Sequence, residues 1–540
     1  MFWALDSSKK SNTLTLVLHE LLLRIREEEQ MAPDPLKIAI VGAGIAGLCT
    51  AKTLKSFGHA VTVFEKEVDV GGVWSASRRY PGLTTQNPKE TYDFSDFPMP
   101  DDYPEWPSGE QMQDYLESYV RHFDLTENLV LGTSVSRAEL KEGGESWQVE
   151  TVGEVSQQFT FDYLIVCNGI FSIPSVPQYA GEEAYKAAGG RILHTSEFTR
   201  LEDARNKNVL VVGYGKSSCD AANAIAGVSK STTLIARHLI WKIPKKLKKL
   251  NMKFLFLTRM GEGLFRYIRV SGFEKFLHGK GKRIRDAMMN SVEGVIEKQL
   301  QLSALGLHPE KPLETIARST VSLVTDGFYE KIESGVLTMK KGVEIVELAD
   351  GSAKLSDGES LPADLIVCGT GWSQEVPFLN RETVEKLTDD KGNFRLYRTM
   401  LPINIPRLLF NGYNSSFFSQ LNAEVGALWL VEYISGNIAV PSESEMRTLI
   451  DERLAWTEAR TDGKHSRGTN IIPFSVHQMD EILNEISLNL GPWKRFTQWL
   501  LPVRGSDYKH LPKQLQRRHV LGEKAGTQRS QARTSVSAAG

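Results

Sequence analysis

The sequence predicts an α/β protein with two doubly wound units of parallel sheet, the second unit inserted into the first. An apolar strand, a glycine-rich turn, a helix and a second strand follow one another at residues 37–66 and again at 208–237. A strand sequence with the pattern D-(x)-L-I-V-C stands just before the second unit, at 161–169, and just after it, at 362–371. We interpret these two strands as the ones by which the chain leaves the first domain and returns to it.

Length and composition set the domain number and exclude some classes of protein. The 540 residues exceed one ordinary domain. A hydrophobic fraction of 41%, a charged fraction of 24% and a net charge of −2 are typical of a globular protein, not of a nucleic-acid binder. The expected segments are an N-terminal extension (1–35), the first domain in two parts (36–170 and 364–511, the latter with a C-terminal helical substrate region), the inserted domain (171–363) with a basic helical insertion (237–310), and a disordered tail (512–540).

The cysteines argue against disulfide redox chemistry and against a metal site. The four cysteines are far apart, so neither a CxxC pair nor the spacing of zinc ligands occurs. A disulfide reductase, which would also pair FAD with NADPH, needs such a cysteine pair. We expect buried thiols and no bound metal.

The first glycine-rich turn lies between the strand KIAIV (37–41) and an Ala- and Leu-rich helix. A helix N-terminus offers unpaired N–H groups and partial positive charge, both of which suit a pyrophosphate. Glu65 ends the next strand, where a carboxylate hydrogen-bonds ribose hydroxyls. The turn residues predicted to bind a dinucleotide are Gly42, Ala43, Gly44, Ile45, Ala46 and Gly47.

A second glycine pair follows Glu65 closely, and plain nicotinamide dehydrogenases have no need of it. Gly71 and Gly72 permit close approach of the backbone to a cofactor, and Trp74 is placed to pack on it. We therefore expect Gly72, Val73 and Trp74 to contact FAD, which makes the first unit a Rossmann-like FAD-binding domain.

The second glycine-rich turn differs from the first in its polar residues and in the end of its second strand. That strand ends in Arg237, where the first unit has an acid. An acid would repel a 2′-phosphate, whereas an arginine pairs with it. We therefore predict a Rossmann-like NADPH-binding domain inserted in the FAD-binding domain. Its predicted cofactor contacts are Gly213, Gly215, Lys216, Ser217, Ser218 and Arg237.

A strongly basic stretch follows Arg237. Residues 237–285 contain fifteen Lys or Arg and two acids. One interpretation is a solvated helical lid over the NADPH-binding domain, and the other is reversible contact with an anionic membrane. Because the chain has no apolar run of about 20 residues, we expect no transmembrane helix. We expect a cytoplasmic location, with peripheral membrane contact through this stretch left open.

Several motifs in order resemble one enzyme family. They are GAGIAG, GGVW, TTQNPKETYDFSDFPMP (84–100), CNGIFSIPSVP (167–177), GYGKSS and VCGTGW (367–372). Over about residues 36–440 the chain resembles a flavin-containing monooxygenase with two dinucleotide-binding domains, similar to members found in fungal secondary metabolism. The resemblance implies that NADPH reduces FAD, that O₂ adds to form a flavin C4a-hydroperoxide, and that one oxygen atom enters a small organic substrate.

The resemblance also implies one position near the reacting atoms. The family usually has an asparagine three residues before Lys89, and this chain has Gln86 there, with Asn87 beside it. Gln86 and Asn87 are therefore the candidate catalytic amides, and Thr85 is expected to line the same place beside the cofactor. No general base and no catalytic triad are implied.

A second departure bears on the reaction. Baeyer–Villiger relatives carry the pattern F-x-G-x-x-x-H-x-x-x-W, whereas HTSEF here runs from His194 to Phe198 without the tryptophan. This favours N- or S-oxidation or hydroxylation over ester formation from a ketone. An N-hydroxylase of ornithine type and a Baeyer–Villiger monooxygenase remain alternatives, as does a non-catalytic flavin sensor or membrane-docking protein. The substrate and the oligomeric state are not readable from the sequence.

Overall fold

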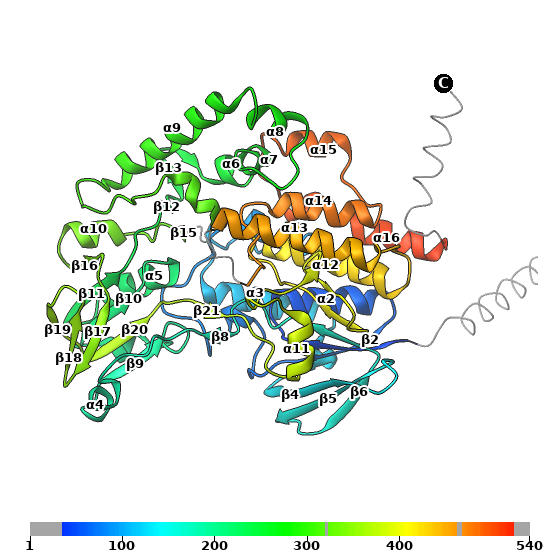
Figure 1. The fold of residues 1–540 in the computed structure, drawn as a ribbon, viewed down its shortest axis with the longest axis horizontal. Helices are drawn as coiled ribbons and strands as arrows, with labels where there is room; N and C mark the ends of the chain where they lie inside the picture. Colours follow the sequence, from blue (N-terminus) through cyan, green and yellow to red (C-terminus); the bar gives the residue numbers. More distant parts are fainter. Residues whose placement is uncertain (1–34, 319–321, 462–466, 523–540) are drawn as a thin grey trace, which may run out of the picture.

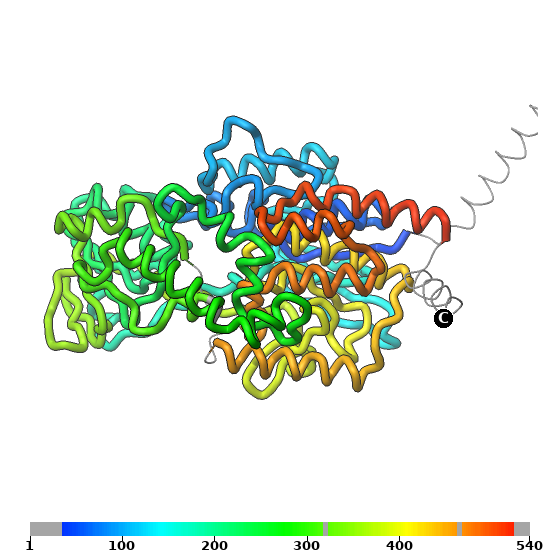
Figure 2. The backbone as a smooth tube through the Cα atoms, turned by 90° about the horizontal axis from the view of Figure 1, so that it is seen from above, coloured from blue at the N-terminus to red at the C-terminus, as the bar shows by residue number. Residues whose placement is uncertain are grey.

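The computed structural model describes residues 35–318, 322–461 and 467–522 (Figure 1). The expectations for residues 1–34 and 523–540 lie outside the described residues. Figure 2 shows the second domain, in green, as a lobe on the left, with the blue and the yellow-to-red parts of the chain together in the larger body on the right.

The first domain is built on a parallel sheet with the strand order β24-β7-β1-β2-β3. Along β1, Ile38 and Ile40 belong to a core with helices on one face, while Ala39 and Val41 belong to a core with antiparallel strands on the other, as period-two alternation requires. The strands are β1 (Lys37–Val41), β2 (Ala60–Phe64), β3 (Leu129–Val130), β7 (Tyr163–Val166) and β24 (Leu408–Phe410). The helices on the first face are α2 (Ile45–Ser56), α3 (Gly109–His122) and α12 (Ser419–Ile434), and the antiparallel layer is β4 (Thr133–Leu140), β5 (Trp147–Gly153) and β6 (Gln158–Phe161).

The second domain repeats this plan with the order β16-β11-β10-β20-β9, again all parallel. Leu210 and Ile366 pack on antiparallel strands, whereas Val209 and Val211 belong to the core on the opposite face. Its parallel strands are β9 (Arg191–His194), β10 (Asn208–Val212), β11 (Ser231–Ala236), β16 (Thr338–Lys341) and β20 (Leu365–Cys368). Its antiparallel layer is β17 (Ile345–Ala349), β18 (Ser352–Leu355) and β19 (Ser360–Pro362), and its helices include α4 (Glu182–Ala187), α5 (Lys216–Ile225) and α10 (Phe328–Glu333). The predicted fold class is confirmed, with a strand layer on one face of each sheet.

The interpretation of the repeated D-(x)-L-I-V-C strands holds for the first strand, which lies in the first sheet, and is wrong for the second. β7 pairs with β1, and β20 pairs with β10, so the two are equivalent strands of two similar domains. The chain therefore returns to the first domain after β20, and the expected boundary at residue 364 moves past this strand. The crossings between domains are instead β8 (Ile173–Pro174) and β21 (Trp372–Ser373), which pair antiparallel.

The basic insertion is a mixture of short strands and helices. It comprises β12 (Lys242–Ile243), β13 (Lys246–Leu247), β14 (Leu250–Asn251), α6 (Lys253–Phe256), α7 (Arg259–Gly263), α8 (Gly272–Leu277) and α9 (Lys282–Leu300), and β12 pairs with β15 (Ser322–Leu323). Among the described residues, no helix combines the length and the apolar character that crossing a bilayer requires.

The C-terminal region is helical and covers the first domain. Its elements are α11 (Arg381–Leu387), β22 (Leu396–Tyr397), β23 (Leu401–Pro402), α13 (Glu443–Thr461), α14 (Ser475–Glu485), α15 (Pro492–Thr497) and α16 (Leu511–Val520). The expectation of a disordered tail from residue 512 is wrong for α16, because Leu511 and Leu515 are buried in the core and anchor this helix.

Candidate active site

The first glycine turn is held tightly between β1, α2 and β7. Gly42 has a φ of +109°, and a side chain there would meet the Cys167 carbonyl oxygen at 2.6 Å. Gly47 lies on α2, and its added Cβ would stand 1.8 Å from the Gly42 carbonyl oxygen. Any side chain at Gly47 would therefore push the helix N-terminus away from the turn that it completes.

The second glycine pair lies directly over this turn. A Cβ on Gly72 would approach the Gly44 Cα to 3.2 Å, so two backbone segments meet where a cofactor would be held. Buried Glu65 accepts hydrogen bonds from the Ala43 N–H at 2.8 Å and the Glu67 N–H at 3.0 Å. Burial raises the pKa of Glu65, while these two N–H donors favour its charged form. Its carboxylate lies where the ribose acceptor was predicted.

Val73 and Trp74 follow the glycine pair in a short 3₁₀ turn, Gly72–Trp74. Trp74 is buried against Tyr92, with ring centroids 6.1 Å apart in an edge-to-face arrangement. Ile45 and Ala46 open helix α2 beside the turn and are partly buried.

The second glycine turn has the same backbone and different surroundings. Gly213 has a φ of +111°, and its added Cβ would meet the Gly369 carbonyl oxygen at 2.6 Å. A Cβ on Gly215 would meet no heavy atom within 4 Å, so open space remains where a phosphate would approach. The first turn is approached by Gly72 at the equivalent residue, Gly44.

Two polar side chains predicted as donors in this turn are already engaged. Ser218 is fully buried, and its hydroxyl donates to the Gly369 carbonyl at 3.0 Å, so the expectation that this hydroxyl faces a phosphate is wrong. Lys216 donates to the buried Asp220 carboxylate at 2.5 Å. Ser217 is partly exposed at the helix start.

A buried lysine lies behind the second turn, and the sequence patterns did not identify it as part of the site. Lys242 is 1% exposed, and its ammonium donates to the Tyr214 carbonyl at 2.9 Å and to the Ser322 hydroxyl at 3.0 Å. It also lies 4.5 Å from the centre of the Tyr214 ring. Burial lowers the pKa of Lys242. The signal was present, because Lys242 stands between Trp241 and Ile243 in an otherwise apolar run.

Arg237 follows the end of β11 and is largely exposed, as recognition of an incoming phosphate would require. Its side chain is 72% exposed, and one guanidinium nitrogen lies 3.6 Å from a Glu344 carboxylate oxygen. An exposed ion pair of this length contributes little, so Arg237 can exchange it for a phosphate.

The candidate amides lie between the two domains. The Gln86 side-chain oxygen accepts a hydrogen bond from the Leu323 N–H of β15 at 3.2 Å. The Asn87 amide donates to the Phe417 carbonyl, just before α12, at 2.6 Å. Buried Thr85 donates to the Asn87 carbonyl at 2.8 Å. Neighbouring residues thus face opposite partners, the NADPH-side domain and the C-terminal part of the FAD-side domain.

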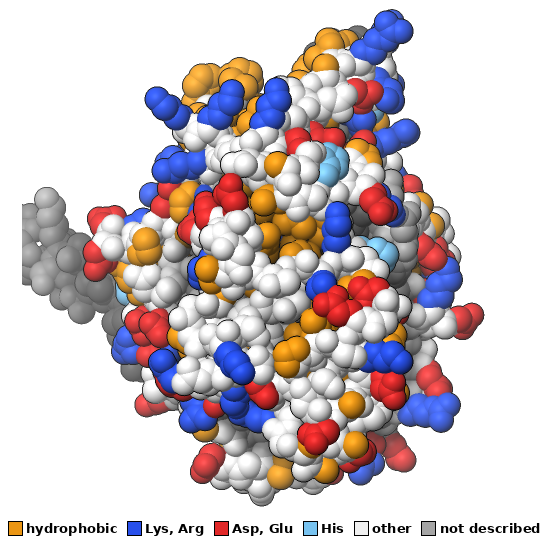
Figure 3. All heavy atoms as spheres, turned by 90° about the vertical axis from the view of Figure 1, so that its left-hand side faces the viewer, with side chains coloured by type: hydrophobic (Ala, Val, Ile, Leu, Met, Phe, Trp, Pro, Cys, Tyr) orange, Lys and Arg blue, Asp and Glu red, His pale blue; other side chains and the backbone are white. Residues whose placement is uncertain are grey.

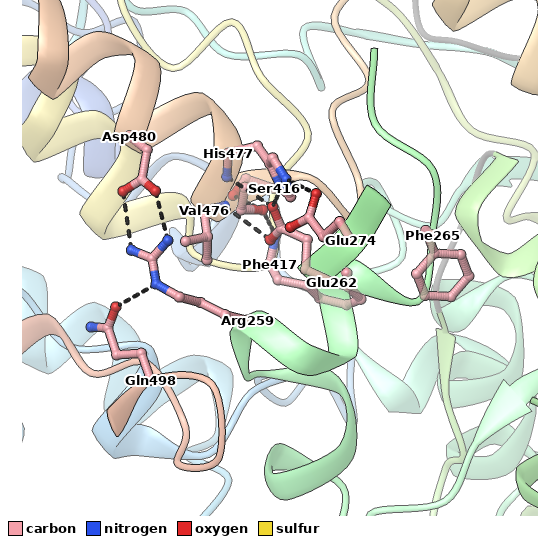
Figure 4. A network of polar contacts seen from close by, with 12 residues as sticks. Arg259, Glu262, Phe265, Glu274, Ser416, Phe417, Val476, His477, Asp480 and Gln498 are labelled. Atoms are coloured by element: carbon pink, nitrogen blue, oxygen red, sulfur yellow. Dashed lines mark hydrogen bonds and ion pairs between the residues drawn. The ribbon is translucent and has the colours of Figure 1, made fainter. Parts of the chain in front are cut away.

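A buried ionic network ties the basic insertion to the C-terminal helices (Figure 4). Glu262 of α7 accepts from the Val476 and His477 N–H groups at the start of α14. The His477 ring bridges Glu262 at 2.5 Å and Glu274 of α8 at 3.0 Å, and these carboxylates raise the pKa of His477 to about 10. Arg259 donates to both oxygens of Asp480, at 2.6 and 3.0 Å.

This network reaches toward Asn87. Ser475, at the start of α14, accepts hydrogen bonds from the Ser416 hydroxyl and the Phe417 N–H. Phe417 in turn accepts from Asn87. The insertion of the NADPH-side domain is therefore connected through α14 to the neighbourhood of the candidate amides.

His194 belongs to the crossing between the domains. Its Nδ1 accepts from the Ser196 N–H at 3.2 Å, which places the proton on Nε2, 3.0 Å from the Gly371 carbonyl oxygen. Its ring packs edge-to-face on Trp372 of β21, and burial lowers its pKa. His194 therefore holds the crossing strands, and buried Phe198 packs into the core nearby.

Each turn fits one of the two dinucleotides. The first turn offers tight glycine packing, a second glycine pair and the buried Glu65 carboxylate after β2. The second offers open space beside Gly215 and an exposed arginine at the end of its second strand. No group of three or more His, Cys, Asp or Glu side chains suited to a metal occurs in the described ranges. This combination defines a flavoprotein that pairs FAD with NADPH.

Comparison with known proteins identifies the family. The model of the Flavin-binding monooxygenase-like family matches residues 35–491, and the chain belongs to this family. It is an NADPH-dependent flavoprotein monooxygenase that uses FAD and O₂.

Curated relatives and solved structures agree with this family. The chain is 27% identical over 533 residues to the probable flavin-containing monooxygenase 1 of Arabidopsis thaliana, covering 88% of this chain and 96% of the relative. It is 28% identical to flavin-containing monooxygenase 1 of Rattus norvegicus, covering 77% of each. The S-allyl-L-cysteine S-oxygenase of Allium sativum shares the fold with a TM-score of 0.59 and 22% identity over 86% of this chain and 91% of that one. Cyclohexanone monooxygenase from Rhodococcus sp. Phi1 shares it with a TM-score of 0.63 and 16% identity over 84% and 98%.

Proposed function

We propose that this monooxygenase transfers oxygen to a nitrogen or sulfur atom of a small organic substrate. The observation that carries the proposal is the order of sequence identity, since the TM-scores of the two solved structures, 0.59 and 0.63, run the other way. The S-oxygenase is 22% identical to this chain, whereas the cyclohexanone monooxygenase is 16% identical. Curated relatives at similar coverage include the human dimethylaniline monooxygenase [N-oxide-forming] 4, at 27% identity. The absence of the tryptophan after HTSEF supports the same preference.

We assign the cofactors to the turns by their geometry. FAD fits the first turn with Glu65 as its ribose acceptor, and NADPH fits the second with Arg237 as its 2′-phosphate partner. Bound together, these cofactors supply hydride transfer and oxygen activation. The protein positions them and excludes water from the space between the domains.

We assign Gln86 and Asn87 to the space where the two cofactors and the substrate meet. Each amide is bonded to a different wall of that space, Leu323 on one side and Phe417 on the other. Each can donate or accept at a reacting atom if its wall moves slightly. Gln86→Ala and Asn87→Ala should lower the ratio of product formed to NADPH consumed, measured together with hydrogen peroxide release. Unchanged coupling in both variants would remove these residues from the site.

Labelled oxygen tests the proposed reaction. The purified enzyme, NADPH and ¹⁸O₂ are incubated with a panel of tertiary amines, sulfides, indoles and ketones. The masses of the products are then measured by mass spectrometry. We expect one labelled oxygen on an amine or sulfide. A labelled ester from a ketone would instead support the Baeyer–Villiger alternative. If the purified protein shows no NADPH-dependent O₂ consumption with any of these compounds, the result would favour a flavin sensor.

We further infer peripheral contact between residues 237–285 and an anionic membrane. Several cations of this stretch stabilise the fold instead, because Lys242, Arg259 and Arg285 are buried and form hydrogen bonds or ion pairs within the protein. Lys275, Lys280 and Arg283 are exposed, and no carboxylate of a described residue lies within salt-bridge distance of them. These cations support contact with an anionic surface.

A further inference from the structure

Exposed aromatic and aliphatic side chains gather where α8 and α15 meet. On α8 they are Phe273 and Phe276, whose rings stack with centroids 5.7 Å apart. On α15 they are Trp493 and Phe496, which are 74% and 59% exposed. Leu500 and Leu501, just after α15, are also exposed. We call these six residues the α8–α15 surface.

The two parts of this surface are fixed against each other. The Arg259 N–H donates to the Gln498 carbonyl at 2.8 Å, and the Val503 N–H donates to the Leu257 carbonyl at 2.8 Å. The Phe273 ring packs edge-to-face on Trp499 at 5.9 Å. Arg259 donates to Asp480, as Figure 4 shows. Arg495 donates to the same carboxylate, so α7, α14 and α15 form one block. The apolar surface is therefore built into the fold from two distant parts of the sequence.

Cations surround the α8–α15 surface. Residues 263–285 and 491–502 contain nine Lys or Arg. Five of them pair with acids of neighbouring segments, namely Arg269, Lys282, Arg285, Lys494 and Arg495. The other four, Arg266, Lys275, Lys280 and Arg283, are exposed, and no carboxylate of a described residue lies within salt-bridge distance of them. Glu274 is buried against His477, so it does not offset the charge of these four cations. Figure 1 places α8, α9 and α15 along one edge of the molecule, and Figure 3 shows hydrophobic side chains at that end with blue cations beside them.

We propose that the α8–α15 surface docks this enzyme on an anionic lipid bilayer, with its aromatic side chains in the interface and its cations at the headgroups. This inference rests on the membrane contact proposed above. It assigns that contact to a surface formed by α8 of the basic stretch together with α15 of the C-terminal region. Tryptophan and phenylalanine beside Lys and Arg match the composition of interfacial contacts. A second copy of the chain fits less well, because a two-fold contact would bring two cationic surfaces together.

Sedimentation of the full-length holoenzyme with vesicles tests the proposal. Vesicles of phosphatidylcholine, and of phosphatidylcholine and phosphatidylserine in equal parts, are compared at low and physiological salt. We expect the wild type to sediment with the anionic vesicles and much less with the neutral ones. Trp493→Ser/Phe496→Ser and Lys275→Glu/Arg283→Glu should each weaken binding roughly tenfold, the second with a loss of salt dependence.

Matched variants beside the parallel sheet and the antiparallel strands of the second domain serve as controls. Val336→Ser/Val346→Ser removes two exposed apolar side chains, and Lys230→Glu/Lys354→Glu reverses two exposed cations. Both should bind vesicles as the wild type does. Flavin absorbance and NADPH oxidation without vesicles should be unchanged in all four variants, which shows that they are folded.

Three outcomes would overturn the proposal. Absence of the wild type from both pellets rejects the membrane contact itself. Binding that the α8–α15 variants leave intact keeps the membrane contact and rejects this surface. Concentration-dependent self-association without vesicles, abolished by Trp493→Ser/Phe496→Ser, would assign the surface to a second copy instead. None of these outcomes affects the monooxygenase function, which is measured without lipid.

Discussion

The two glycine turns have nearly the same backbone conformation, but the residues around them differ. Gly42 and Gly213 have φ values of +109° and +111°, and beneath each lies a carbonyl oxygen 2.6 Å from an added Cβ. The third position differs, with Gly47 in the first turn and the buried Ser218 in the second. The residues at the strand ends also differ, an acid in one domain and a base in the other.

This difference shows how one supersecondary unit is adapted to two nucleotides. In both domains the turn and the helix N-terminus form the phosphate site that we propose. The first turn is closed by Gly72 and a buried acid, which suits a resident cofactor. The second is open at Gly215 and ends in an exposed arginine, which suits a nucleotide that is exchanged.

The largest expected effect comes from giving the first turn the residue of the second. In Gly47→Ser, the new Cβ would lie 1.8 Å from the Gly42 oxygen, so the helix must shift. We expect a loss of about 3 kcal/mol in stability and loss of FAD, measured by thermal unfolding and by flavin absorbance after gel filtration.

The reciprocal variant is the control. Ser218→Gly removes one hydrogen bond to Gly369 and should cost about 1 kcal/mol with FAD retained. If Gly47→Ser keeps its full flavin content, the two turns are interchangeable and the comparison fails.

Arg237→Ala should weaken the preference of the second turn for NADPH over NADH. Loss of a charge-assisted contact to the 2′-phosphate should raise the NADPH KM by about tenfold or more, with much less change for NADH. Steady-state kinetics with both nucleotides measure this. Arg381→Ala, on exposed helix α11, is the control, and equal effects of Arg237→Ala on both nucleotides would reject the role.

Lys242→Met tests the cation behind the second turn. The Tyr214 carbonyl loses its buried donor, so NADP⁺ affinity should fall about tenfold. Global stability should change little, because removal of a desolvated charge offsets the lost bonds. Titration of NADP⁺ by calorimetry measures the affinity.

Lys245→Met, three residues further on, removes a partly exposed pair with Asp326 and should leave NADP⁺ affinity unchanged. FAD content should be normal in both lysine variants. Equal affinities of the two variants for NADP⁺ would show that Lys242 supports only the fold.

The last prediction concerns the ionic block that joins the basic insertion to the C-terminal helices. The pKa of His477 rises to about 10 in the folded protein, from about 6.5 when unfolded. Its stabilising contribution is therefore complete below about pH 6.5 and is lost as the pH rises through about 10. Thermal unfolding over this range should show a steeper fall for the wild type than for His477→Gln, and parallel curves would contradict it.

Local patterns in the sequence predicted much of the fold and the ligand preference. A strand, a glycine turn and a helix are encoded by neighbouring residues, so both dinucleotide units could be found from their own segments. The residues at the strand ends, Glu65 and Arg237, could be located by counting along the same units, and their roles at the two cofactors stay predictions. The four buried cysteines were expected for similar reasons, because they fall in apolar strands and helices.

Other expectations failed where two distant segments had to be compared or paired. The strands at 161–169 and 362–371 look alike because they occupy equivalent positions in two domains, and only the pairing of β20 with β10 showed this. Helix α16 has the polar composition of a tail and is ordered by Leu511 and Leu515 packed in the core. Ser218 was expected to face a phosphate and is turned inward by Gly369.

The sequence by itself determined that this protein has two nucleotide-binding units of opposite character at their strand ends, because those features depend on short-range spacing. Only the tertiary structure decided what lies between and around them. It placed Gln86 and Asn87 between opposite walls, set Lys242 behind the second turn, and joined α8 to α15 in one apolar and basic surface. These arrangements depend on contacts between residues far apart in the chain, and no local pattern records such contacts.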